Sequence, residues 1–170
     1  MGRGAVKTVE ADYARQMWLV RGLFEEYVGS LDFDIAFQDL EKELPGLPGD
    51  YAPPDGRILL AVEGDEVAGC IALRKIDEET CEGKRLYVRP AFRGKGAGRA
   101  LCEAVIGEAR KIGYRRMLLD TVESLNKANA LYRALGFRGT EPYRYNPLEG
   151  AVFMELDLVS GPPASTPDKP

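Results

Sequence analysis

The chain has 170 residues, of which 45% are hydrophobic and 29% are charged, and its net charge is −4. This composition fits one globular domain with a sizeable core, and the negative charge argues against nucleic acid as the main partner. The sequence contains no histidine, which excludes Ser-His-Asp and Cys-His mechanisms and most zinc sites. We therefore expect no metal cofactor, and acid–base chemistry from other side chains or water.

Targeting signals are not evident in the sequence. No apolar run approaches the ~18–20 residues that cross a bilayer, and the opening residues MGRGAVKTVE lack the apolar core of a secretory signal. Cys70, Cys81 and Cys102 are an odd number of cysteines without close spacing, which indicates reduced and mostly buried thiols. We expect a cytoplasmic protein with no membrane partner.

The first half of the chain predicts one strand, two helices and then three strands. AVKTVEA is typical of a short strand, apolar residues at helical spacing predict a helix over 13–30, and a second helix near Phe37 to Leu44 ends at Pro45. The strands RILLAVEG, EVAGCIALRKI and TCEGKRLYV follow. The turns EGDE and DEET between them favour an antiparallel meander.

The second half of the chain alternates helices and strands. Helices are predicted over 98–112 and 126–135, each closed by a glycine, with the buried strand RRMLLDTV between them. RGTEPY and AVFMELDL predict two final strands, so the expected order is β-α-α-β-β-β-α-β-α-β-β. We expect one domain over 5–158 and a disordered, proline-rich tail over 159–170.

Charge is unevenly distributed along the chain. Residues 25–55 contain nine acids and one base, whereas residues 84–116 contain ten bases and two acids. The first segment favours cations and the second favours anions, although both segments can equally be solvated faces.

The string RGKGAG at residues 93–98 lies between a predicted strand and a predicted helix. A helix N-terminus presents unpaired N–H groups and the positive end of the helix dipole. Gly94, Gly96 and Gly98 leave the backbone uncrowded. The neighbouring cations add charge-assisted contacts, and they are Arg93, Lys95 and Arg99. Together these features predict a phosphate cradle.

Other phosphate motifs fit this string less well. The P-loop pattern G-x-x-x-x-G-K-[ST] does not occur in the sequence. The dinucleotide fingerprint G-x-G-x-x-G/A requires glycine or alanine where the chain has Arg99 or Leu101, although Asp120 after the next strand suits a ribose-binding acid. A dinucleotide-dependent oxidoreductase and a glycine-rich turn without a ligand both stay open as alternatives.

RGKGAG resembles the R/Q-x-x-G-x-G/A pattern of the GNAT superfamily of acetyl-CoA-dependent N-acetyltransferases. The longer string LYVRPAFRGKGAGRAL resembles the strand, loop and helix of that family, and ALYRALGF resembles its later helix with a tyrosine and a closing Gly-Phe. The resemblance covers residues 5–158. It implies a single α/β (α+β) domain with a mixed, mostly antiparallel sheet of about seven strands, flanked by about four helices.

The resemblance implies coenzyme A contacts on two neighbouring segments. The loop amides of the family bind the pyrophosphate, and the matching positions are Arg93, Gly94, Lys95, Gly96, Ala97 and Gly98, with Arg99 nearby. The preceding strand hydrogen-bonds pantetheine through its main chain, which implies Leu86, Tyr87 and Val88. Such β-like pairing needs an unpaired strand edge, so we expect this strand to splay from RRMLLDTV. Asn126 and Asn129 complete the implied coenzyme contacts.

The resemblance also implies that Tyr132 protonates the departing thiolate, since a thiolate leaves more easily beside a proton donor. A tyrosine at this position can instead pack in the core. We expect the amine to attack the thioester of acetyl-CoA directly, while a main-chain N–H near Val88 polarises the carbonyl.

The general base for the attacking amine has two leading candidates. Glu82 is the first, and a water held by Glu82 and main-chain carbonyls is equally a candidate. Glu82 can instead pair with Lys84 or Arg85. Asp120 and Glu123 are weaker candidates for the same role.

The acceptor site of this family lies between the first two helices and the last hairpin. Here those elements correspond to the acidic segment 25–55 and EPYRYNPLEG, so the acids predict a small, cationic amine acceptor. An aminoglycoside, a polyamine, an amino acid and a protein N-terminus all stay open as acceptors. Tyr143 and Tyr145 are expected to wall the pocket, and Arg144 to bind a carboxylate. A catalytically inactive acyl-CoA-binding sensor is the alternative function. Homodimerisation is common in the family.

Overall fold

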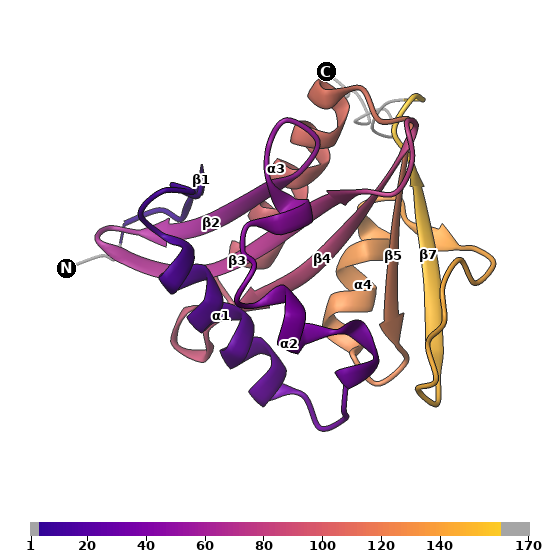
Figure 1. Ribbon diagram of the computed structural model, residues 1–170, viewed down its shortest axis with the longest axis horizontal. Coiled ribbons are helices and arrows are strands. Elements are labelled where there is room, and N and C mark those ends of the chain that lie inside the picture. Colours follow the sequence, from indigo (N-terminus) through magenta and orange to yellow (C-terminus); the bar gives the residue numbers. More distant parts are fainter. Residues whose placement is uncertain (1–3, 161–170) are drawn as a thin grey trace, which may run out of the picture.

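The computed structural model describes residues 4–160, which form one sheet with helices on both faces (Figure 1). The strands are β1 Lys7–Glu10, β2 Arg57–Glu63, β3 Glu66–Lys75, β4 Thr80–Val88, β5 Arg116–Val122, β6 Arg138–Gly139 and β7 Ala151–Asp157. The α-helices are α1 Met17–Ser30, α2 Leu40–Glu43, α3 Ala97–Ile112 and α4 Asn126–Ala134. This order agrees with the predicted one and confirms the predicted fold class.

Two elements are shorter than predicted. The second helix consists of a 3-10 turn over Ala36–Gln38 and the single turn α2, because Asp39 between them has a left-handed φ of 55°. The predicted strand RGTEPY is reduced to β6, since Pro142 cannot donate to a strand ladder. The part of the predicted tail from residue 161 onward lies outside the described residues.

The sheet separates two hydrophobic cores. Side chains alternate along β2, so Leu59 belongs to one core while Ile58 and Leu60 belong to the other. Helix α3 covers the first face with buried residues such as Leu101, and α1 covers the second with Phe24. Burial of each such side chain stabilises the fold by about 1.5–3 kcal/mol. The two helix layers therefore hold the middle of the sheet rigidly from both sides.

Strands β4 and β5 diverge in the middle of the sheet, whose strand order is β1-β2-β3-β4-β5-β7-β6. They pair in parallel only where Thr80–Glu82 meets Arg116–Leu118, although both strands continue beyond that point. In β4, Arg85 and Leu86 together oppose the single residue Ile71, and Arg85 has a φ of 61°. This β-bulge bends the strand away from its neighbour. The predicted splay between these two strands is confirmed.

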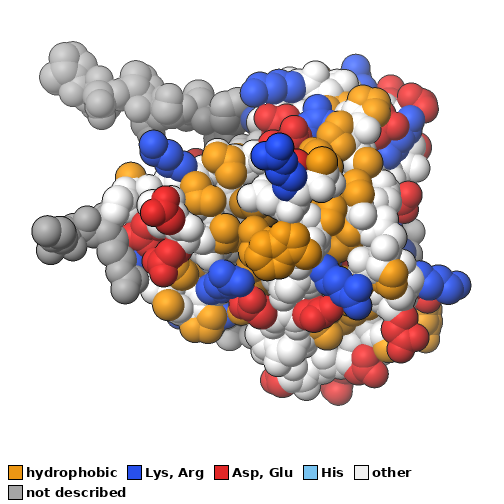
Figure 2. All heavy atoms as spheres, turned by 60° about the vertical axis from the view of Figure 1, so that its left-hand side comes forward, with side chains coloured by type: hydrophobic (Ala, Val, Ile, Leu, Met, Phe, Trp, Pro, Cys, Tyr) orange, Lys and Arg blue, Asp and Glu red, His pale blue; other side chains and the backbone are white. Residues whose placement is uncertain are grey.

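On the face shown in Figure 2, hydrophobic side chains lie in patches separated by charged side chains of both signs. Within residues 4–160, no helix is long and apolar enough to cross a membrane. Cys70, Cys81 and Cys102 are free thiols and all three are buried, as predicted.

Candidate active site

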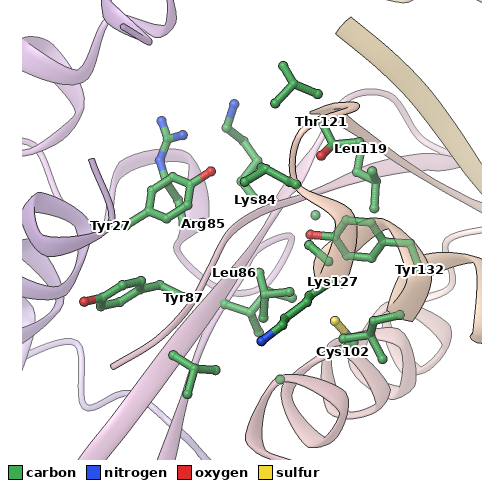
Figure 3. A pocket seen from close by; sticks show the side chains of 18 of the residues that line it. Tyr27, Lys84, Arg85, Leu86, Tyr87, Cys102, Leu119, Thr121, Lys127 and Tyr132 are labelled. Carbon is green, nitrogen blue, oxygen red and sulfur yellow. The ribbon is translucent and has the colours of Figure 1, made fainter. Parts of the chain in front are cut away.

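A pocket of about 770 Å³ occupies the wedge between β4 and β5. We call its two ends the cofactor side, on the α3 and α4 face of the sheet, and the acceptor side, on the α1 and α2 face. Figure 3 shows Lys84 and Arg85 extending together on one side of the pocket, while Tyr132, Cys102 and Lys127 gather on the other. The volume is in the range of small-molecule and cofactor sites.

The cofactor side is built from the loop 93–98 at the start of α3. Gly94 has a φ of 79° and Gly96, which caps the helix, has a φ of 83°; both angles favour glycine. Within the described part of the chain, no main-chain carbonyl accepts a hydrogen bond from the amides of residues 94–99. These unpaired amides and the helix dipole make the loop an anion-binding cradle.

The cations around this loop are paired with other protein groups. Arg93 lines the pocket, but its Nε donates to the Val88 carbonyl at 2.9 Å. Lys95 pairs with Glu63 at 3.4 Å. Arg99 pairs with Glu103 at 2.9 Å on the exposed surface of α3. The cradle therefore consists mainly of main-chain groups, and the side chains of Lys95 and Arg99 do not line the pocket.

Tyr132 reaches the pocket from α4, and its ring packs edge-on against Phe137 at 5.8 Å between centroids. Its hydroxyl makes no hydrogen bond within the described residues. Burial raises the pKa of Tyr132 well above its usual value, so the phenol is neutral and carries a proton to donate. Leu86 and Val88 line the same side of the pocket from the part of β4 that does not pair with β5.

The two asparagines of α4 lie in different environments. Asn126, the first residue of the helix, is exposed and lines the pocket. Asn129 is buried, where its Nδ2 donates to the Val122 carbonyl at 2.8 Å and its Oδ1 accepts from the Thr121 hydroxyl at 2.9 Å. Because both polar atoms of Asn129 are already bonded within the protein, this side chain joins α4 to β5 and does not line the pocket.

Glu82 is fully buried and does not line the pocket. One carboxylate oxygen accepts from Arg74 at 2.7 Å, and the other accepts from the Tyr143 hydroxyl at 2.5 Å and from Arg144 at 3.1 Å. Burial alone would raise the pKa of Glu82, but Lys84 and these partners hold it below its usual value. A buried carboxylate with a lowered pKa and three hydrogen-bond donors is a weak base without direct access to the pocket. The geometry therefore agrees with the alternative in which Glu82 pairs with neighbouring cations.

Segment 25–55 lines the pocket with residues such as Tyr27 and Gln38, but its acids do not face the pocket as expected. None of its nine acids lines the pocket. Its acids instead pair with the basic segment: Glu26 with Arg89 at 2.9 Å and Glu43 with Arg85 at 2.8 Å. These opposite charges thus join α2 to β4 and α1 to the residue that follows β4.

The last hairpin also differs in part from its predicted role. Tyr143 donates to Glu82 and packs against Phe153, while Tyr145 is 75% exposed. Arg144 contacts Glu82 and lies 3.8 Å from a carboxylate oxygen of Asp120. Arg144 therefore binds carboxylates, as expected of its charge, but they are carboxylates of the protein.

Comparison with known proteins places the chain in a family. The family model described as the acetyltransferase (GNAT) family matches residues 12–137. The chain belongs to the GNAT family. It is 39% identical to an uncharacterized N-acetyltransferase of Schizosaccharomyces pombe over 80% of this chain and 85% of that protein. It is 31% identical to an uncharacterized N-acetyltransferase of Dictyostelium discoideum over 90% of this chain and 99% of that protein.

The fold comparison agrees with this assignment. A Salmonella typhimurium protein described as an acetyltransferase, and solved with its cofactor acetyl-CoA, superposes with a TM-score of 0.65 at 24% identity, covering 91% of this chain and 95% of that chain. Together with the family match and the two relatives, this makes the chain an enzyme of the N-acetyltransferase class. Among residues 4–160, no group of three or more acidic or cysteine side chains is placed to hold a metal ion.

Sequence analysis did not assign several residues on the acceptor side of this GNAT domain. Tyr27, Gln38, Lys84, Arg85 and Asn146 all line the pocket there. The available signal was the pair of adjacent cations in the predicted buried strand TCEGKRLYV, because lysine and arginine are rarely buried without a partner or a function.

Proposed function

We propose that this GNAT enzyme transfers the acetyl group of acetyl-CoA to a primary amine of a small acceptor by direct attack. The observation that carries this proposal is the loop 93–98, whose unpaired amides open into the same pocket as the free edge of β4 and Tyr132. The amides fit a pyrophosphate, and the edge beyond Glu82 fits the amide chain of pantetheine.

The reaction replaces a carbon–sulfur bond by a carbon–nitrogen bond and moves one proton from nitrogen to sulfur. The neutral amine attacks the thioester carbonyl carbon, the carbon–sulfur bond breaks, and the thiolate of coenzyme A takes the phenolic proton of Tyr132. The proton that the nitrogen loses after its attack restores the phenol through water. The neutral, raised-pKa phenol of Tyr132 suits this donor role. A main-chain N–H near Val88 stabilises the charge that develops on the carbonyl oxygen.

The amine loses its proton to water in this proposal. Glu82 is fully buried and already ion-paired, so it does not contact the acceptor directly. Asp120 is the one acid among the described residues that lines the pocket, and it accepts from Asn146 at 3.1 Å. No buried histidine or cysteine nucleophile is needed, because direct transfer forms no acyl-enzyme.

Calorimetric titration with acetyl-CoA tests the cofactor assignment. The wild-type protein is expected to bind in the micromolar range, and Gly96→Glu is expected to weaken binding about 100-fold, because the new carboxylate blocks and repels the pyrophosphate. Gly113→Glu is the matched control: Gly113 lies at the other end of α3, also has a left-handed φ, and has open space around it. This control is expected to bind normally.

Two other outcomes would contradict the proposal in different ways. Failure of the wild-type protein to bind acetyl-CoA would mean that the glycines form only a turn. Tight binding without release of the coenzyme A thiol in the presence of any amine would instead identify an acyl-CoA-binding sensor.

A further inference from the structure

The acceptor side of the pocket contains a cluster of charged side chains in which cations outnumber carboxylates. We call it the acceptor-side cluster. Its cations are Arg74, Lys84, Arg85 and Arg144, and its carboxylates are Glu43, Glu82 and Asp120. Counted over the ion pairs within 4.0 Å, four cations face three carboxylates, so one positive charge is in excess when all seven groups are ionised; the exposed Asp50 acts on Arg74 only at longer range. Because the cluster is largely buried, such an excess is costly.

Lys84 is the member of the cluster that lacks a close partner. Its nearest carboxylate oxygen belongs to Glu82 and is 3.9 Å away, and that same oxygen already accepts from Arg74 at 2.7 Å. Its other polar neighbour is the neutral Gln38 Oε1 at 3.3 Å. The side chain of Lys84 is only 4% exposed. The ammonium is thus taken from water without receiving a charged partner of its own.

Electrostatics at Lys84 agree with this geometry. Burial lowers the pKa of Lys84 to about 7; Glu82 opposes this shift, and the neighbouring arginines add to it. A buried cation in this state is stabilised by any anion that enters beside it. Lys84 lines the pocket, and Figure 3 shows its amine extending past the strand beside Arg85.

We infer that the acceptor is a small amine that also carries a carboxylate, and that Lys84 and Gln38 bind that carboxylate. The inference rests on the proposed acetyl transfer and names the class of its acceptor. The other cations already have partners, since Arg85 donates to Glu43 and to Gln38. The carboxylate of the acceptor would supply the fourth negative charge and balance the cluster.

The position of Lys84 along β4 suits an amino acid. Lys84 precedes Leu86, where the proposed pantetheine contact begins, by two residues across the bulge, or at most about 7 Å of strand. A hydrogen bond from Lys84 to the carboxylate, together with the few bonds between carboxylate and amine in an amino acid, spans this distance along β4. A cation close to the amine also favours its neutral form, which is the nucleophile. Lys84 would therefore position the acceptor and help it to lose its proton.

A polycationic acceptor fits this surface less well. Its additional ammonium groups would lie near Lys84 and Arg85, while the pocket-lining carboxylate of Asp120 already accepts from Asn146 and lies near Arg144. Like charges in a partly desolvated site repel each other strongly. The charges of the pocket thus select against polyamines and in favour of zwitterions.

The test uses matched acceptors that differ only in the carboxylate. Free α-, β- and γ-amino acids are compared with the corresponding amino-acid amides, in a thiol-release assay with saturating acetyl-CoA. The wild-type enzyme is expected to prefer the best amino acid over its amide by about 30-fold or more in kcat/KM, as expected for a buried charge pair. In Lys84→Met this preference is expected to fall to within about threefold, through a rise in KM for the acid.

Two controls separate binding from folding. Lys111→Met removes a lysine whose side chain is 77% exposed on α3, and it is expected to keep the wild-type preference. Lys84→Met removes an unbalanced buried charge, so its melting temperature is expected to equal or exceed that of the wild type. A lower melting temperature would mean that Lys84 is a structural partner of Glu82, which would contradict the inference.

Other results of the same assays would contradict the proposed role of Lys84. Equal use of acids and amides, or failure of every amino acid to be acetylated or bound, would overturn the carboxylate assignment. An equal loss of kcat on acid and amide in Lys84→Met would make Lys84 the general base instead. Absence of acetyl-CoA binding would contradict the proposed function itself and is therefore distinguishable from these results.

Discussion

The cofactor side and the acceptor side of the pocket bind charge with different parts of the chain. On the cofactor side, the anion-binding groups are main-chain amides of one six-residue loop, 93–98, at a helix N-terminus. On the acceptor side, the charges belong to side chains from β3, β4, β5, α2 and the loop between β6 and β7. A local stretch of sequence thus suffices for the first, whereas the second exists only once the whole sheet has formed.

This difference has consequences for evolution and for mutation. Main-chain amides keep their positions when neighbouring side chains change, so the cofactor side can stay constant. The acceptor side changes its charge with a single substitution, because each side chain there has a distinct partner. Under the proposed function, donor binding therefore depends on the backbone, and acceptor specificity depends on side chains.

The largest effect is expected from Glu82→Gln, which tests whether the acceptor side depends on a buried ionic network. The substitution keeps the size of the side chain but leaves Arg74 and Arg144 without their shared carboxylate. Removing one partner of a buried ion pair costs about 3–5 kcal/mol. Urea unfolding at neutral pH should show this loss. The exposed pair Arg21–Glu25 offers a control, since Glu25→Gln should cost less than about 0.5 kcal/mol.

The pH dependence of this loss has a definite sign. The pKa of Glu82 is lowered in the folded protein, so its contribution to stability is present above the ordinary glutamate pKa and disappears as the pH falls through the folded value. The stability difference between wild type and Glu82→Gln should therefore be constant near neutral pH and shrink on acidification. A difference that grew on acidification would contradict the ionised carboxylate in this network.

The sequence predicted the cofactor side better than the acceptor side for a physical reason. RGKGAG sets two left-handed glycines and a helix start within six residues, so its amides are unpaired whatever surrounds them. The acids of residues 25–55 were predicted to bind a cationic ligand, but the structure does not place them in the pocket. Glu26 and Glu43 instead form ion pairs with Arg89 and Arg85. Charge along a sequence shows that partners are needed, but only the tertiary structure shows which ones are used.

The splay of β4 from β5 was predictable from the family resemblance, whereas the position of Lys84 was not. The splay follows from the strand edge that the family resemblance requires, and a bulge at Arg85 produces it. The burial of Lys84 depends on the arrangement of Gln38 and Glu82 around it. No periodicity in the strand sequence specifies that arrangement.

A smaller effect, confined to catalysis, is expected from Tyr132→Phe on the cofactor side. The change removes only the hydroxyl and keeps the ring against Phe137. Loss of a positioned proton donor lowers kcat by about 100-fold, while the dissociation constant for acetyl-CoA, measured by calorimetry, should change little. Tyr114→Phe is the control, because the Tyr114 hydroxyl donates to the Asp55 carbonyl away from the pocket. An unchanged kcat in Tyr132→Phe would remove this residue from the proposed mechanism.

The smallest effect is expected from alanine substitutions of Asn129 and Asn126, which lie on the same helix in different environments. Asn129→Ala leaves the Thr121 hydroxyl and the Val122 carbonyl without their buried partner, which should lower the free energy of unfolding by about 1–3 kcal/mol. Asn126→Ala changes an exposed side chain and should alter stability by less than about 0.5 kcal/mol, while it weakens acetyl-CoA binding. Urea unfolding and calorimetry on both variants give the comparison. If Asn129→Ala kept full stability and lost coenzyme affinity instead, its amide would be a ligand contact and the link between α4 and β5 would lie elsewhere.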